Sequence, residues 1–135
     1  MKYLITLLFI SSSYSQTLKV ELDKIPEEEG KAMLALYNSE TNYDEEDKPF
    51  KHLICERKNF EAKSCQFEKL EKGTYSLAIF WDQDGDKELD TNFVGYPSED
   101  FGFSQNPTII AGKPSYDSTK FDYDGSDKTL KIELK

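Results

Sequence analysis

Residues 74–81 restrict the fold of this chain more than any other segment, because their large apolar side chains alternate. Every second residue from Tyr75 to Trp81 is large and apolar, which places these side chains on one face of an extended strand. Aromatic and aliphatic residues dominate the segment, as is typical of a central strand. We therefore expect a sheet built around residues 74–81.

Shorter alternating stretches occur along the rest of the chain, separated by Gly, Pro, Asn and Asp. We expect strands over residues 17–25, 31–38, 50–56, 63–67, 74–81, 120–123 and 129–134. Residues 38–49 and 92–116 are expected to be loops. Because no stretch has a helical period longer than about two turns, the pattern predicts an all-β fold. The expected fold is an antiparallel β-sandwich of about seven strands, immunoglobulin-like or prealbumin-like, with a small closed barrel as the alternative.

Residues 1–15 are expected to be a signal peptide. Lys2 supplies a positive charge, residues 3–10 are apolar, and small residues precede Gln16. The apolar run is far shorter than the ~20 residues of a membrane-spanning helix. We therefore expect a single β-sandwich domain over residues 16–135, exported to the periplasm or the exterior, monomeric and without a membrane span.

The chain is acidic, with a formal net charge of −9. Nucleic acids and anionic lipids are bound by patches of Lys and Arg, so a charge of this sign argues against both as partners. The same charge attracts divalent cations to the surface in general, which competes as an explanation with any specific metal site.

Cys55 and Cys65 are the two cysteines of the chain. In an exported protein a single pair is most simply a disulfide, because thiols are not kept reduced outside the cytosol. The alternative is a soft-metal site, but His52 is the only histidine, and three ligands do not complete a structural zinc site. We predict a disulfide between Cys55 and Cys65.

The acidic segment that follows the central strand has the spacing of a metal-binding loop. Carboxylates occupy positions one, three, five and nine of this loop, at Asp82, Asp84, Asp86 and Asp90. Alternate residues of a tightly curled loop direct their side chains to one centre, and Ca²⁺ takes six to eight oxygen ligands. The sequence predicts a Ca²⁺ site, with the backbone carbonyl of Glu88 at position seven. The alternative is a solvated acidic turn.

The loop departs from the EF-hand, which has Gly at position six and a bidentate Glu at position twelve. Here these positions hold Lys87 and Phe93. The loop is more similar to the Asp-x-Asp-x-Asp-Gly-x-x-Asp calcium loops found between strands in β-rich extracellular proteins. Lys87 in place of a loop glycine is expected to weaken ion binding.

Aromatic side chains gather in the irregular segment after the acidic loop, at Phe93, Tyr96, Phe101, Phe103 and Tyr116. They would form either a stacking platform for a sugar or peptide, or a small core that orders a long loop, and we favour the small core.

No catalytic residues are identified from the sequence. The single histidine, His52, lies in a predicted strand without an evident nucleophile beside it. Paired carboxylates would suit a hydrolase, but those of the acidic loop are too close together. We therefore expect that the protein is not an enzyme.

Three separated motifs together resemble a family of exported bacterial proteins. They are residues 73–82 (Gly-Thr-Tyr-Ser-Leu-Ala-Ile-Phe-Trp-Asp), 89–97 (Leu-Asp-Thr-Asn-Phe-Val-Gly-Tyr-Pro) and 101–106 (Phe-Gly-Phe-Ser-Gln-Asn). In this order they are similar to domain-of-unknown-function family 2141, and the resemblance covers nearly all of the chain after the signal peptide. It implies an exported β-sandwich with loop oxygens at the four aspartates already named, and no established role.

Two functions remain open at this point. The first is a Ca²⁺-stabilised binding or accessory module of the bacterial envelope or exterior, whose partner is an unidentified protein or glycan. The second is a purely structural β-sandwich domain that binds neither a metal nor a small ligand.

Overall fold

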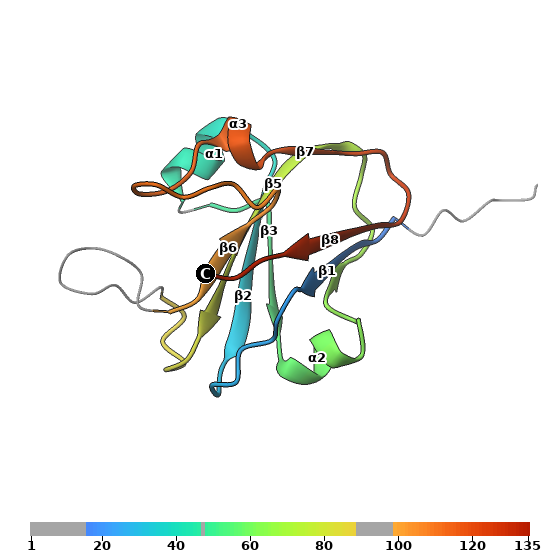
Figure 1. Cartoon of the computed structure of the whole chain (residues 1–135). Coiled ribbons are helices and arrows are strands. Elements are labelled where there is room, and N and C mark those ends of the chain that lie inside the picture. Colours follow the sequence, from blue (N-terminus) through green and yellow to red (C-terminus); the bar gives the residue numbers. More distant parts are fainter. Residues whose placement is uncertain (1–15, 47, 89–98) are drawn as a thin grey trace, which may run out of the picture.

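The computed structural model describes residues 16–46, 48–88 and 99–135, and these residues form two facing β-sheets (Figure 1). The larger sheet has the order β3-β2-β5-β6, with β7 also paired to β5, and the smaller sheet has the order β4-β1-β8. The strands are β1 (Leu18–Leu22), β2 (Lys31–Tyr37), β3 (Lys51–Cys55), β4 (Gln66–Phe67), β5 (Gly73–Asp82), β6 (Phe101–Phe103), β7 (Phe121–Tyr123) and β8 (Lys128–Ile132). The predicted all-β sandwich is confirmed. The predicted signal peptide lies outside the described residues.

The core lies between the sheets and follows the alternation of the strands. On β5 the side chains of Leu77 and Trp81 are 0% and 1% exposed, and on β2 Leu36 is 0% exposed. The smaller sheet contributes Val20 and Ile132, which are both fully buried. Burying a side chain of this size stabilises the fold by roughly 1.5–3 kcal/mol, so the period-two pattern accounts for why these strands form a sandwich.

Three short helices lie in loops or in connections between the strands that the sequence pattern predicts. They are α1 (Glu40–Glu45), α2 (Arg57–Glu61) and α3 (Tyr116–Thr119). Polar caps explain two of the starts, because Ser39 Oγ accepts from the Asn42 N–H (3.2 Å) and Ser115 Oγ accepts from the Ser118 N–H (3.3 Å). The helices are too short to show a hydrophobic period. None of the helices in the described part of the chain is long and apolar enough to cross a membrane.

Two features of the sheets also differ from the sequence prediction. Strand β6 lies in the segment predicted to be irregular and pairs with β5 in the register Ala78↔Phe103, Ile79↔Gly102 and Phe80↔Phe101. Strands β1 and β8 pair in parallel, whereas an antiparallel arrangement was expected throughout. The other strand pairs of the described residues are antiparallel.

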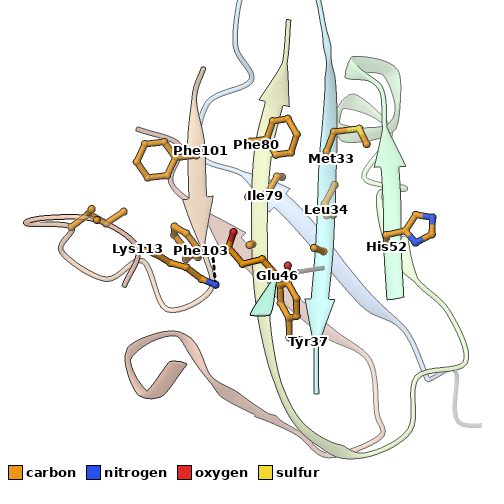
Figure 2. Close-up of a pocket in the computed structure, with 14 residues that line it drawn as sticks. Met33, Leu34, Tyr37, Glu46, His52, Ile79, Phe80, Phe101, Phe103 and Lys113 are labelled. Carbon is orange, nitrogen blue, oxygen red and sulfur yellow. Dashed lines mark ion pairs between the residues drawn. The ribbon is translucent and has the colours of Figure 1, made fainter. Parts of the chain in front are cut away.

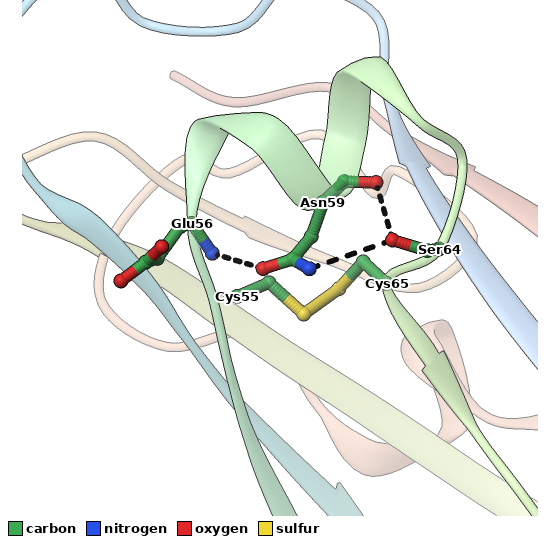
Figure 3. Close-up of a disulfide and its surroundings, with 5 residues drawn as sticks. All are labelled: Cys55, Glu56, Asn59, Ser64 and Cys65. Atoms are coloured by element: carbon green, nitrogen blue, oxygen red, sulfur yellow. Dashed lines mark hydrogen bonds between the residues drawn. A yellow bond between two sulfur atoms is a disulfide. The ribbon is translucent and has the colours of Figure 1, made fainter.

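The predicted disulfide is present and joins the two sheets (Figure 3). Cys55 ends β3 of the larger sheet, and Cys65 immediately precedes β4 of the smaller sheet. Their Cα atoms are 5.8 Å apart, and α2 fills the connection between them. Asn59 of this helix closes the connection, accepting the Glu56 N–H at 2.8 Å and approaching Ser64 Oγ at 3.4 Å.

Backbone contacts join the sheets on the other side of the sandwich. Phe101 of β6 and Lys135, just after β8, exchange two backbone hydrogen bonds of 3.1 and 2.8 Å. Gly102 makes this approach possible, because a Cβ atom at that position would lie 2.8 Å from the backbone oxygen of Glu133. Both lateral edges of the larger sheet are therefore tied to the smaller one.

Candidate metal centre

The acidic loop begins at the last residue of the central strand. Asp82 ends β5, lies opposite Lys31 of β2, and has a side chain that is only 4% exposed. Its Oδ1 accepts the Gly85 N–H at 3.1 Å, and its Oδ2 accepts the Lys87 N–H at 2.9 Å. One rigidly placed carboxylate thus folds the next five residues back over the end of the strand.

The following aspartates repeat this turn on a smaller scale. Asp84 Oδ1 accepts the Asp86 N–H at 3.2 Å, and Asp86 Oδ1 accepts the Glu88 N–H at 2.9 Å. Short side chains that bind the backbone two residues ahead are typical of Asx turns. The result is a tight curl in which alternate carboxylates point to the same side.

Two residues of the curl have left-handed backbone conformations. Gly85 has φ +77°, which costs a glycine nothing, and Lys87 has φ +63°. Such a conformation costs a residue with a side chain of the order of 1–3 kcal/mol, and it persists where the surroundings determine it. Here the Lys87 N–H bonded to Asp82 supplies that constraint. The lysine therefore does not abolish the predicted curl, although it makes it less favourable.

Three of the predicted ligands converge on one point. Carboxylate oxygens of Asp82, Asp84 and Asp86 all lie within 4.8 Å of one another. Oxygens on opposite sides of one Ca²⁺ ion, at 2.3–2.6 Å each, are separated by up to about 5 Å, so a single cation could contact all three. Glu88 is next in the loop and is exposed, and Asp90 lies outside the described residues.

A further carboxylate supports the loop and was not singled out by the sequence patterns. Glu99, which precedes β6, is 4% exposed, and its Oε2 accepts the Gln83 N–H at 2.6 Å. The loop is thus held at its base by two buried carboxylates, those of Asp82 and Glu99. Nothing local marks Glu99, because its proximity to Gln83 arises only from the pairing of β5 with the segment leading into β6.

The other residues considered from the sequence are distributed over the molecule. Tyr116 packs against Tyr43 of α1 with ring centroids 5.7 Å apart. Phe101 is buried, Phe103 is partly exposed beside it, and His52 is exposed on β3. Phe93 and Tyr96 lie outside the described residues.

The fold and loop define a class: a two-sheet β-sandwich whose central strand ends in a curled acidic loop. A family model described as "Uncharacterized protein conserved in bacteria (DUF2141)" matches residues 20–131. The chain therefore belongs to this family, which the sequence motifs indicated. No curated protein and no solved structure matches the chain.

Proposed function

We propose that this protein is an exported accessory module whose β-sandwich is stabilised by a Ca²⁺ ion in the Asp82–Asp90 loop. The observation that carries the proposal is the convergence of the Asp82, Asp84 and Asp86 carboxylates, one of them buried. Carboxylates held this close repel one another unless a cation is present. A backbone carbonyl at Glu88, the Asp90 carboxylate and water would complete the shell.

Export is supported by the signal-like segment 1–15 and by the disulfide, which is stable in an oxidising compartment. The periplasm and the exterior both satisfy this requirement. Binding of an envelope protein or glycan, and not catalysis, is the role we propose for the module. A pull-down from envelope extract with the oxidised protein would identify such a partner.

The metal proposal is tested by thermal unfolding in EDTA and in millimolar CaCl₂. Ligand at about 100 times Kd adds roughly 2.7 kcal/mol to the stability of a folded protein with one site. Equal ionic strengths of NaCl and MgCl₂ separate specific binding from general attraction of cations to an acidic surface. A melting temperature that is the same in EDTA and CaCl₂ would favour the alternative, a purely structural domain with an acidic turn.

Loop variants locate the ion. Asp84→Asn keeps an oxygen but removes a charge, so calorimetry should show a modest loss of Ca²⁺ affinity, and Asp82→Ala should lose more. Lys87→Gly removes a positive charge and the left-handed strain, and should raise the affinity. Asp44→Asn is the matched control, because Asp44 is exposed on α1 at the opposite end of the sandwich (Figure 1). Unchanged affinity in all three loop variants would place the ion elsewhere.

A further inference from the structure

The outer face of the larger sheet is apolar along its two central strands. An exposed sheet face normally carries polar residues in alternation with the buried ones. On β2, however, the residues that alternate with the core are Met33, Ala35 and Tyr37, and on β5 Ala78 and Phe80 occupy this face. Ser76, which comes before them on β5, is buried and hydrogen bonded to Thr119 of α3 at 2.7 Å. Tyr37 is buried in the small core around α1. The other four are only partly buried and do not belong to the core between the sheets, so their apolar character needs another reason.

The strand registers arrange these side chains into a trough that runs across the sheet. Ala35 and Ala78 are direct partners, and the same row continues to His52 on β3 and Phe103 on β6. Two small side chains thus form a floor between two larger residues. Four strands at a spacing of ~4.8 Å give the row a length of about 14 Å.

One wall of the trough is the neighbouring row of large apolar side chains. Met33 pairs with Phe80, and Phe80 pairs with Phe101, so the three stand side by side, two residues along each strand from the row that contains the alanines. Phe101 and Phe103 contact each other edge to face, with centroids 6.2 Å apart. Figure 2 shows these rings and Met33 lining the same side of the sheet.

The opposite wall is held in place by the small core around α1. Tyr37 packs edge to face on Tyr43, with centroids 5.6 Å apart. Lys113 reaches over the Tyr43 ring at 3.8 Å and forms an ion pair of 2.8 Å with Glu46, which Figure 2 marks by a dashed line. Ile109 completes the lining from the loop before Lys113. The cavity has a volume of about 480 Å³, within the range of ~300–1,000 Å³ typical of small-molecule sites.

Charge indicates which ligands suit the trough. The charged side chains that line it are Lys113 and Glu46, and these neutralise each other. The protein as a whole has a formal charge of −9. This charge disfavours an anion in a site where the described lining residues offer no uncompensated cation. Ile110, beside the lining residue Ile109, is 92% exposed, so apolar surface continues at the rim.

We propose that the trough over Ala35 and Ala78 is a binding site for an uncharged, apolar small molecule. This site is built from residues other than the acidic loop, so its occupancy is expected in EDTA as well as in calcium. An apolar ligand would bury the exposed parts of Met33, Phe80 and Phe103, and the trough needs no polar anchor to hold it.

Two fluorescent probes that differ by one charge provide the test. N-phenyl-1-naphthylamine is neutral, and 1-anilinonaphthalene-8-sulfonate has the same ring system with an added sulfonate. We expect one neutral probe to bind per chain, with at least about tenfold higher affinity than the anionic one. The reason is that, among the described residues lining the trough, the sulfonate finds no lysine free of an ion pair. Tighter binding of the anion would overturn the assignment of an uncharged ligand.

Filling the floor of the trough tests its location. Ala78→Phe should lower the affinity for the neutral probe at least about tenfold, because the added ring occupies the binding volume. Ala62→Phe, which adds the same ring at an exposed position just after α2, should leave it unchanged. If Ala78→Phe does not fold, as judged by circular dichroism, Ala35→Leu makes the same test with a smaller side chain.

Two results would contradict the proposal. The first is no saturable binding of the neutral probe, or binding that the floor variants leave intact. The second is light scattering that shows a dimer for the parent and a monomer for Ala78→Phe, since a second copy of the chain would then be the occupant of the trough.

Discussion

Breaking the disulfide should remove a large part of the stability of this protein. Cys55 and Cys65 are separated by 10 residues in sequence, and loop-closure entropy for a ring of that length corresponds to roughly 2.7 kcal/mol at 25 °C. Domains of this size are stable by only about 5–15 kcal/mol. Both sulfur atoms belong to buried residues, 2% and 0% exposed, so their removal also leaves unfilled space in the core.

Urea unfolding of three forms separates these two contributions. The protein reduced with dithiothreitol keeps the sulfur atoms but loses the ring, so it should be less stable than the oxidised form by roughly 2–3 kcal/mol. The double variant Cys55→Ala/Cys65→Ala should lose this amount and a further packing contribution. Its urea dependence should also be steeper, because an unfolded chain without the cross-link exposes more surface.

The controls for this experiment are internal. Dithiothreitol should change the midpoint of the oxidised protein and leave that of the double variant unaltered. The reasoning would be refuted by a reduced protein within about 0.5 kcal/mol of the oxidised one, since that would mean that the ring does not restrict the unfolded chain.

Three further predictions concern packing, buried polar groups and pH. Gly102→Ala should lower the free energy of unfolding in urea by about 1–3 kcal/mol, because its Cβ would lie 2.8 Å from a backbone oxygen. Gly73→Ala is the control, because the Cβ there would meet no atom closer than 3.6 Å, and equal stabilities of the two variants would contradict this. Ser104→Ala should cost about 1–3 kcal/mol by the same assay. The buried Leu77 N–H donates to Ser104 Oγ at 3.0 Å and would lose this acceptor, so an unchanged stability would refute the prediction. Burial raises the pKa of Tyr43 to about 12 from 10.0. Its contribution to stability is therefore complete below pH 10 and lost as the pH rises through 12; an ultraviolet titration in which every tyrosine ionises near 10 would disprove this.

The long alternating strands could be predicted from the sequence because one face of each is buried along its whole length. Residues 74–81 show this most clearly, and β5 differs from them only by one residue at each end. Strand β6 has three residues, one of which is Gly102, so it has no period of its own. Its extended conformation is set by pairing with β5, and this tertiary contact leaves no signal in the local sequence.

The two candidate sites also differ in how far they could be predicted from local sequence. Asp82, Asp84 and Asp86 are neighbours in sequence, so their spacing alone predicted that they would converge. The trough depends on Ala35 lying opposite Ala78, a register between distant strands. If β2 shifted by one residue against β5, Ala35 would turn to the other face of the sheet and no longer lie beside Ala78. An alternating pattern does not fix which partner residues meet.

The parallel pairing of β1 with β8 determines when this fold can be completed. Leu18 lies beside Lys128 and Leu22 beside Ile132, so one edge of β1 is paired by β8, which is far from it in the sequence. Contacts between residues this distant in sequence slow folding, and β-sandwiches with many such contacts fold in milliseconds to seconds. A chain that emerges N-terminus first therefore leaves Val20 and its neighbours incompletely covered until residues 128–132 have appeared. During that interval the unfinished smaller sheet has an unpaired strand edge and exposed apolar side chains, and both favour aggregation.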